Sequence, residues 1–464
     1  MRGRGTSRLA AAALVSGLVA AGALTAARPA AADETAQSRS GASATMGGLK
    51  TFGAAVIHDG GQEQQVSAGL FEMSVDGGGT LQTYCVDLYN PTQRDAKYHE
   101  TPWSGTSLGA NKQAGRIRWI LQHSYPQVND LAALAEEAGI HGGLTEQDAA
   151  AGTQVAIWRY SDGAHVDAVD PQAEQLADHL FKSARDLPEP AASVTLDPPA
   201  VSGHPGALLG PVTVHTDAAG VAVSPPADAG MSGVRIVGKD GKPVTAAANG
   251  TQLFFSVPED AAAGSARLTV QASTTVPVGR AFTSDSRSQT QILAGSSEST
   301  VSATASATWA AEGPIPALSA KEDCVKGGVD ITAVNRGDEP FTFELMGAEH
   351  TVPAGASRTV TMPLQEDQPY DVTITGPAGL SRRFTGVLDC KTRGSAPAVT
   401  TQTVAEPSPA TVGGSTATTG ATGTNLAATG GGALTPVIAG SAIGLVVIGG
   451  AVLILLRRRE ADQG

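Results

Sequence analysis

Three cysteines are the first residues in this chain of 464 whose types allow covalent chemistry: Cys85, Cys324 and Cys390. Cys324 and Cys390 bracket a β-prone segment, and in an oxidising exterior the simplest interpretation of such a pair is a disulfide. Cys85 is then left alone. An unpaired cysteine in an exported chain is a buried thiol, an intermolecular disulfide, a nucleophile or some other crosslink.

A glutamine further along the chain is the second candidate. Cys85 lies in a strand-like run over residues 81–89, and Gln154 lies in a segment with helical signals. Thr145 and Asp148 have the spacing of a capping box, which predicts that the helix begins there. On that helix Gln154 shares a face with small and apolar side chains, namely Ala150, Ala151, Ile157 and Trp158. We therefore expect Gln154 to point inward.

A buried glutamine must find partners for two N–H donors and a carbonyl, and missing partners cost about 1–3 kcal/mol. Condensation of this carboxamide with a cysteine thiol would release ammonia and leave a thioester carbonyl. The alternative is a core glutamine bonded to nearby backbone, with Cys85 as an ordinary core cysteine elsewhere.

Composition excludes several classes of protein. The formal charge is −13, and no stretch collects enough Lys and Arg to bind a phosphate backbone, so we expect no nucleic-acid partner. Three cysteines exclude a disulfide-dense scaffold and a four-cysteine zinc site. The motifs of other metal sites are also missing from the sequence, so no metal and no cofactor is predicted.

The two ends predict the compartment. Residues 1–32 have a basic start, an apolar run and a final Ala-rich segment, the pattern of a secretory signal peptide cleaved after Ala32. Near the other end an uncharged stretch from Leu434 to Leu456 is long enough to be a transmembrane helix. Three arginines, residues 457–459, follow it and would hold the tail in the cytoplasm.

The residues just before that stretch resemble the sorting signal of Gram-positive surface proteins. They are Leu426, Ala427, Ala428, Thr429 and Gly430. The L-A-x-T-G variant resembles the substrate of class E sortases. The resemblance implies that sortase cuts after Thr429 and joins residues 33–429 to peptidoglycan, so the expected localisation is the cell wall, with a precursor transiently in the membrane.

Shifts in composition divide the exported chain. Small polar residues predict disorder over 33–47. Residues 393–425 are poor in large apolar residues, which predicts a wall-spanning linker. Short β-prone runs separated by Pro and Gly predict β-sandwich domains. The predicted segments are 1–32 signal peptide, 33–47 disordered, 48–190 with the aromatic residues and the helical signals, 193–310 β-sandwich, 314–391 Ig-like β-domain with the disulfide, 393–425 linker and 426–464 sorting signal.

The motifs around Cys85 and Gln154, Y-C-V-D and T-Q-x-A-I-W, together resemble the thioester-domain family of Gram-positive surface adhesins. The resemblance covers about residues 48–190. It implies an internal thioester between Cys85 and Gln154, inside an α+β thioester domain followed by two all-β domains. Four residues lie beside the pair and are expected to position and pack it: Tyr84, Asp87, Thr153 and Trp158.

The predicted function is covalent adhesion. An amine or hydroxyl of a surface protein or other ligand would attack the Gln154 carbonyl and release Cys85, in a single-use reaction that is not enzymatic. One alternative is a secreted cysteine hydrolase in which His123, His141 or His165 activates Cys85. Another is a passive wall-anchored stalk that binds through its β-domains.

Overall fold

The computed structural model of the protein describes residues 40–391. The predicted signal peptide, linker, sorting signal and apolar span lie outside this range. Buried side chains between Ala42 and Trp309 form one hydrophobic cluster, and those between Leu318 and Phe384 form a second. Within residues 40–391 no helix is long and apolar enough to cross a membrane.

The first sheet has seven strands in the order β3-β4-β16-β15-β5-β2-β6. An additional pairing between β2 and β3 closes the first six of these strands into a ring. The bounds of the strands are β2 Ser43–Asp59, β3 Gln62–Val75, β4 Thr80–Cys85, β5 Lys97–Thr101, β6 Val166–Ala168, β15 Ala281–Ser284 and β16 Gln291–Ser296.

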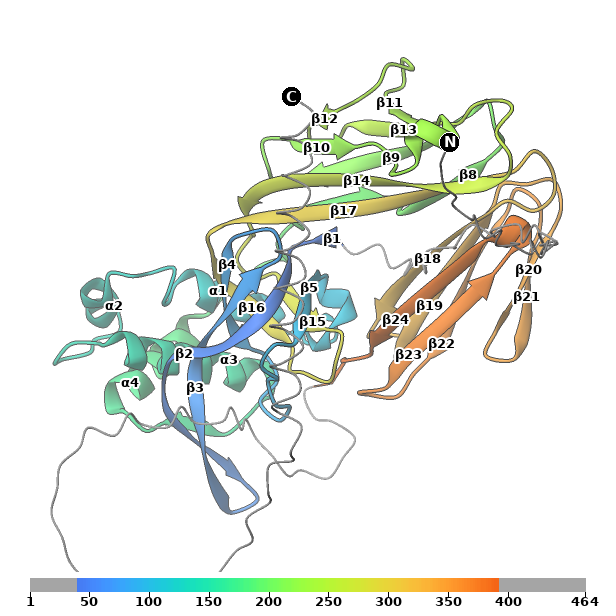
Figure 1. Ribbon diagram of the computed structural model, residues 1–464. Coiled ribbons are helices and arrows are strands. Elements are labelled where there is room, and N and C mark those ends of the chain that lie inside the picture. Colours follow the sequence, from blue (N-terminus) through green and yellow to red (C-terminus); the bar gives the residue numbers. More distant parts are fainter. Residues whose placement is uncertain (1–39, 392–464) are drawn as a thin grey trace, which may run out of the picture. The chain divides into compact units, whose positions relative to one another are not determined.

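Two strands of this sheet come from far along the chain. β15 pairs with β5, and β16 pairs with β4 (Figure 1). In the second pair Gln291 lies opposite Cys85. Both strands fall inside the range 193–310 that was expected to be a separate sandwich. β2 likewise begins within the range 33–47 that was expected to be disordered. The pairings that order these segments are between distant residues, so local composition did not reveal them.

Four helices accompany the sheet, and α3 confirms the predicted helix. Its N-cap Thr145 and Asp148 form the capping box, and every residue from Ala149 to Trp158 is buried. Gly152 permits the close packing of α3 on α4, because a Cβ there would lie 2.5 Å from the Ala173 carbonyl oxygen. The helices are α1 Ala114–Gln122, α2 Leu131–Glu137, α3 Glu146–Ser161 and α4 Pro171–Ser183, with short 3-10 turns at Trp103–Gly105 and Ser107–Gly109.

Two further sheets are built from the range predicted to be a β-sandwich, with the addition of β1 from the start of the described chain. Their orders are β1-β17-β14-β10-β12, with β8 beside β17, and β11-β13-β9-β7. Alternate residues of β17 are buried, as expected for strands with one face on a core. The elements are β1 Ser40–Gly41, β7 Val194–Asp197, β8 Ala200–Gly203, β9 Leu208–Thr216, β10 Val221–Ser224, α5 Ala229–Ser232, β11 Arg235–Val237, β12 Ala246–Ala247, β13 Gln252–Ser256, β14 Gly264–Thr275 and β17 Glu298–Trp309.

The last described domain is all-β and carries the predicted disulfide. Its strands form one three-stranded sheet, β18-β19-β22, and two antiparallel pairs, β20-β21 and β23-β24. Cys324 and Cys390 are bonded to each other, which confirms the pairing predicted from the sequence. The elements are β18 Pro316–Asp323, β19 Gly328–Asn335, β20 Phe341–Leu345, β21 Ala348–Val352, β22 Ser357–Pro363, β23 Pro369–Thr375, a 3-10 turn at Pro377–Gly379 and β24 Ser381–Val387.

Replacing Cys324 with serine is expected to lower the melting temperature of residues 33–429 by several degrees. The bond closes a loop of 66 residues, and releasing a loop of that size in the unfolded chain is worth about 4 kcal/mol in the entropic treatment. Differential scanning calorimetry measures the change, and wild-type protein with reductant should reproduce it. Identical melting with and without reductant would contradict the prediction.

Candidate functional site

Strand β4 and helix α3 bring the two sequence-predicted residues together at the end of the strand. The Cys85 backbone N–H donates to Gln154 Oε1 at 3.0 Å, and Gln154 Nε2 donates to the Cys85 carbonyl oxygen at 2.9 Å. Both side chains are fully buried. The Gln154 carboxamide therefore engages the main chain of Cys85 on both of its polar atoms.

The end of the β3–β4 pairing explains why Gln154 binds the main chain of Cys85. The pairing between β3 and β4 ends with Phe71 opposite Thr83, so β3 is not paired with Cys85. A buried backbone N–H and C=O without partners would be costly there. The amide of Gln154 supplies the missing acceptor and donor, as the next residue of a neighbouring strand would.

A different glutamine reaches the thiol. Gln289 lies two residues before the start of β16, and its Oε1 lies 2.5 Å from Cys85 Sγ. That separation is shorter than a normal hydrogen bond, so the Gln289 carboxamide is in direct contact with the sulfur. Gln291, opposite Cys85 across the sheet, places its Nε2 3.4 Å from the same sulfur.

Neighbouring polar groups hold the Gln289 carboxamide. Its oxygen accepts hydrogen bonds from Thr92 Oγ1 and, at 3.4 Å, from Gln291 Nε2. Its nitrogen donates to the Asp87 carbonyl oxygen. The Gln291 amide is itself oriented by Thr83, whose hydroxyl donates to Gln291 Oε1 at 2.9 Å. Two donors thus converge on the oxygen that would carry negative charge if the Gln289 carbonyl were attacked.

The structure places two different glutamines against Cys85. Gln154, predicted to be the acyl partner, is bound to the main chain of Cys85, whereas Gln289 has its carboxamide against the sulfur. Sequence reasoning missed Gln289, Gln291 and Thr92. One signal was present, because Gln289 and Gln291 alternate in a β-prone run and so share a strand face.

Burial dominates the electrostatics of the site. It raises the pKa of the Cys85 thiol well above its usual range, so the free cysteine holds its proton. Burial also raises the pKa of Asp87, and the nearby charges of Asp389 and Asp162 add to the shift. One oxygen of Asp87, Oδ2, accepts a hydrogen bond from the Asn90 side chain. The other, Oδ1, is buried without a hydrogen-bond partner in the described part of the chain.

The other three predicted neighbours have packing roles. The Tyr84 hydroxyl donates to the Tyr125 carbonyl oxygen at 2.8 Å, and burial raises the pKa of this phenol. Thr153 donates to the Ala149 carbonyl oxygen at 2.7 Å, within its own helix. Trp158 is fully buried, and its Nε1 has no partner among residues 40–391.

The histidines considered for a hydrolase lie elsewhere. His123, His141 and His165 are all exposed, whereas the Cys85 thiol is fully buried beside the polar side chains of Thr92, Gln289 and Gln291. His123 stacks on Trp119 with its Nδ1 2.8 Å from that residue's carbonyl oxygen. In the described range no group of three His, Cys, Asp or Glu side chains is arranged to hold a metal ion.

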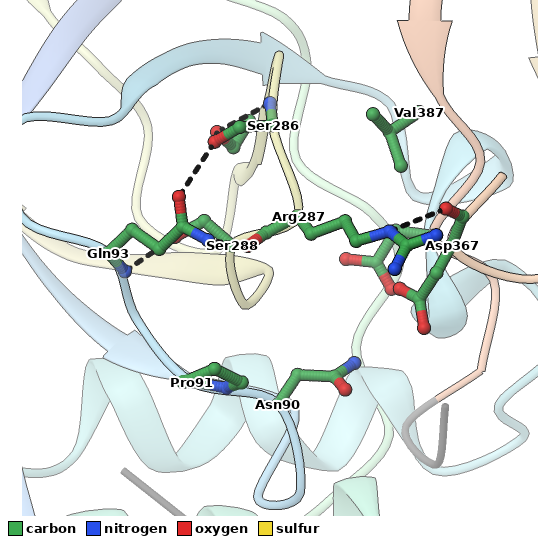
Figure 2. A pocket seen from close by; sticks show the side chains of 10 residues that line it. Asn90, Pro91, Gln93, Ser286, Arg287, Ser288, Asp367 and Val387 are labelled. Atoms are coloured by element: carbon green, nitrogen blue, oxygen red, sulfur yellow. Dashed lines mark hydrogen bonds between the residues drawn. The ribbon is translucent and has the colours of Figure 1, made fainter. Parts of the chain in front are cut away.

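A cavity of about 240 Å³ adjoins the site (Figure 2). Asn90, which binds Asp87, and Ser288, which precedes Gln289, both line it. Arg287 extends across it, and its Nε donates to the Asp367 carbonyl oxygen at 3.0 Å. The remaining lining residues are Pro91, Gln93, Ser284, Ser286, Val387 and Asp389. The cavity is therefore lined by the residue next to Gln289 in the chain, while Gln289 itself is fully buried.

Two family models match parts of the chain. Residues 82–186 match the thioester-domain family, and residues 315–387 match the C-terminal domain of bacterial phospholipase C. The first match includes Cys85 and Gln154 but ends before β15 and β16. No curated protein compared with the chain matches it.

Two solved structures are similar to the chain at low identity. The Bacillus anthracis TIE protein shares 15% identity over 74% of this chain and 63% of its own, with a TM-score of 0.26. The thioester domain of the Enterococcus faecium TIE86 protein shares 15% identity over 58% of this chain and 96% of its own, with a TM-score of 0.28. This chain thus spans less than two thirds of the B. anthracis chain. From the family match we conclude that residues 82–186 belong to a thioester domain.

Proposed function

We propose that this protein is a cell-wall-anchored adhesin that bonds covalently to its partner through an internal thioester between Cys85 and Gln289. The observation that carries the proposal is the 2.5 Å separation between Cys85 Sγ and Gln289 Oε1 inside a buried, hydrogen-bonded site. The thioester-domain match over residues 82–186 supports the reaction class. Gln154, the acyl partner expected from the sequence, becomes a positioning residue.

Formation of the thioester is a condensation. The Cys85 sulfur attacks the Gln289 carbonyl carbon, the C–N bond breaks, and the thiol proton leaves with the amide nitrogen as ammonia. Thr92 and Gln291 donate to the oxygen that carries the negative charge of the tetrahedral intermediate. A carboxamide is a poor acceptor, so this fixed approach of the two groups is what makes the reaction feasible.

Gln154 prepares the nucleophile in this scheme. Its two hydrogen bonds fix the N–H and the C=O of Cys85 and so fix the direction of the Cys85 side chain. Helix α3 is rigid at this point because it is buried along its length from Ala149 to Trp158. Through Gln154 the helix therefore fixes the main chain of Cys85 and with it the position of the thiol.

The partner is a molecule that carries an amine or a hydroxyl, such as a surface protein. Its nucleophile attacks the Gln289 carbonyl, the acyl–sulfur bond breaks, and an amide or ester joins the two molecules. The nucleophile loses one proton and Cys85 gains one, so the step ends with a neutral Cys85 thiol. Each chain reacts once and is consumed, so we do not class the protein as an enzyme.

The proposed location is the cell wall. It rests on the signal-peptide pattern of residues 1–32 and on the L-A-x-T-G segment before an apolar stretch and three arginines. A class E-like sortase would cut after Thr429 and transfer the chain to peptidoglycan. The proposal thus places the reactive domain outside the cell, where an intermolecular bond gives lasting adhesion.

Replacing Thr429 with alanine is expected to move the protein out of the wall fraction of a Gram-positive host that carries the matching sortase. Without the threonine, sortase cannot form its acyl intermediate, and the uncut chain stays in the membrane or enters the medium. Fractionation after muralytic digestion and immunoblotting measures this. Thr424→Ala, a few residues upstream, is the matched control. Equal wall attachment of the Thr429 variant would remove the sorting claim.

The intact mass of residues 33–429 tests the thioester. Fresh protein at mildly acidic pH should be lighter than its sequence by one ammonia, in addition to the hydrogens lost to the disulfide. Methylamine should abolish this deficit and expose the Cys85 thiol to alkylation. A cysteine hydrolase predicts instead the full mass and a thiol that alkylates from the start. That outcome would overturn the proposal.

A further inference from the structure

The last domain contacts the thioester site directly. Thr290, the residue after Gln289, is fully buried and donates from its Oγ1 to Asp389 Oδ2 at 2.6 Å. Asp389 follows β24 and also lines the cavity beside Gln289. Its other oxygen, Oδ1, is buried without a hydrogen-bond partner among residues 40–391. A carboxyl group of the disulfide-bonded domain thus adjoins the reactive residues of the first sheet.

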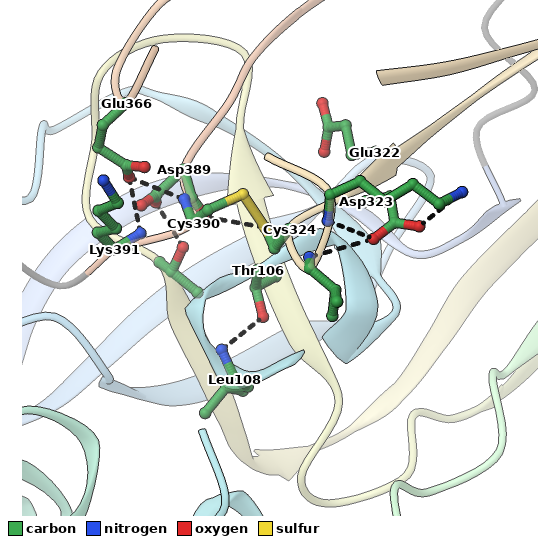
Figure 3. Close-up of a disulfide and its surroundings, with 12 residues drawn as sticks. Thr106, Leu108, Glu322, Asp323, Cys324, Glu366, Asp389, Cys390 and Lys391 are labelled. Atoms are coloured by element: carbon green, nitrogen blue, oxygen red, sulfur yellow. Dashed lines mark hydrogen bonds and ion pairs between the residues drawn. A yellow bond between two sulfur atoms is a disulfide. The ribbon is translucent and has the colours of Figure 1, made fainter. Parts of the chain in front are cut away.

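The disulfide fixes Asp389 in this position (Figure 3). Cys390, the next residue, is bonded to Cys324, whose backbone N–H donates to the Ser104 carbonyl oxygen at 2.9 Å. On the other side Glu366 accepts hydrogen bonds from the backbone N–H groups of Cys390 and Lys391, each at 2.8 Å. The main chain around Asp389 is therefore held from both the first and the last domain.

Asp389 and Asp87, which we name the carboxyl pair, have the same incomplete bonding. Each has one oxygen in a hydrogen bond and one buried oxygen without a partner in the described range. Their negative charges act on each other, and that of Asp389 contributes to the raised pKa of Asp87. Burial raises the pKa of Asp389 to about 7. Repulsion between two such carboxylates disfavours the state in which both are ionised.

The charged groups around the pair are mostly acidic. Glu366, Asp367 and Glu322 raise the pKa of Asp389 further, and Asp162 acts on Asp87. Two cations stand nearby: Arg287 reaches the Asp367 carbonyl oxygen across the cavity, and Lys391 adjoins Glu366. Thr290 is the hydroxyl that binds Asp389. A carboxylate at Asp389 therefore faces the cavity from a region of negative potential, which attracts a proton or a cationic amine.

We propose that the disulfide-bonded domain completes the thioester site, and that the carboxyl pair of Asp389 and Asp87 moves the protons when a nucleophile opens the thioester. The inference rests on the proposed function. It assigns to residues 314–391 a part in the chemistry rather than the role of a spacer alone.

For an amine, opening of the thioester needs one proton to leave the nitrogen and one to reach the Cys85 sulfur. The amine nitrogen in the cavity attacks the Gln289 carbonyl carbon, and the C–S bond breaks with its electron pair on Cys85 sulfur. The Asp389 carboxylate accepts the proton that the nitrogen loses, and the protonated Asp87 carboxyl gives its proton to the thiolate. The pair begins and ends with one proton. The products are the amide at residue 289 and a neutral Cys85 thiol.

The test compares Asp389→Asn with wild type and with Glu344→Gln, an exposed acid of the same domain. Residues 33–429 of each are treated with methylamine over a range of pH, and the released Cys85 thiol is titrated. We expect all three to show the ammonia deficit. The Asp389 variant should open at least about tenfold more slowly at neutral pH, as for loss of an acid–base group.

The pH profile separates a chemical role from a structural one. The amine's own titration raises the rate with pH in every variant, whereas ionisation of Asp389 should add a rise near neutral pH that Asp389→Asn lacks. Thr290→Val, which removes the hydroxyl that binds Asp389, should give an intermediate loss and covers the case in which Asp389→Asn fails to fold. A Cys324→Ser and Cys390→Ser double variant should behave like Asp389→Asn.

The outcomes distinguish this inference from the function on which it rests. Wild-type protein with neither the ammonia deficit nor a methylamine product would overturn both. A reactive wild type beside an Asp389→Asn and a Thr290→Val protein with unchanged rates and unchanged pH profiles would overturn the carboxyl-pair inference alone.

Discussion

Methylamine is expected to label Gln289 and to leave Gln154 unmodified. Opening of a thioester attaches the amine to the acyl residue, and the carboxamide against the Cys85 sulfur is that of Gln289. Gln154 has both polar atoms in hydrogen bonds to the Cys85 main chain and serves to position the thiol. The labelled residue therefore identifies the acyl partner in the wild-type protein, without any substitution.

Peptide mapping reads out this result directly. Trypsin separates the two glutamines, because Arg159 follows Gln154 and Arg287 precedes Gln289. Fragmentation of the peptide that begins at Ser288 then distinguishes Gln289 from Gln291. Cys85→Ala protein is the control, since it has no thioester to open. A methylamide on Gln154 would restore the acyl partner predicted from the sequence and would refute the assignment to Gln289.

Substitution of Gln289 tests the same assignment, because it removes the acyl side of the thioester bond. Gln289→Ala is expected to abolish the ammonia deficit completely, because no acyl group remains opposite the sulfur. Gln252→Ala, at an exposed position of β13, should keep it. Circular dichroism and melting temperature establish that both variants are folded. A folded Gln289→Ala protein that retained the deficit would exclude Gln289.

Thr92→Val is expected to slow the opening of the thioester by methylamine about 100-fold. The Thr92 hydroxyl donates to Gln289 Oε1, the atom that becomes negatively charged in the tetrahedral intermediate. Valine keeps the shape of the side chain and removes this donor. The second donor, Gln291 Nε2, remains at 3.4 Å, so the reaction should be slowed and not abolished.

The rate is measured as the appearance of the Cys85 thiol with a chromogenic thiol reagent. Thr83→Val is the matched comparison, because the Thr83 hydroxyl contacts Gln291 and not the reacting carbonyl. We expect this variant to lose less, since it disturbs only the orientation of the second donor. Equal rates in wild type and Thr92→Val would show that Thr92 does not stabilise the oxyanion.

The sequence by itself determined the parts that depend on neighbouring residues. The capping box of Thr145 and Asp148 fixed the start of α3, because its hydrogen bonds span three residues. The two cysteines at the ends of the last β-domain predicted their own pairing. The motifs around Cys85 and Gln154 predicted a thioester domain, which the family match over residues 82–186 supports.

Only the tertiary structure decided which carboxamide lies against the thiol. Gln289 is 204 residues from Cys85, and it arrives there because β15 and β16 leave the sandwich between β14 and β17 to join the first sheet. The alternation of residues along a strand predicts which side chains lie on the same face of that strand. It does not predict which other strand will pair with it. The same limit hid Asp389, because its contact with Thr290 joins two domains. Local sequence patterns do not predict which residues meet when they are far apart in the sequence. In this protein such long-range contacts form the site.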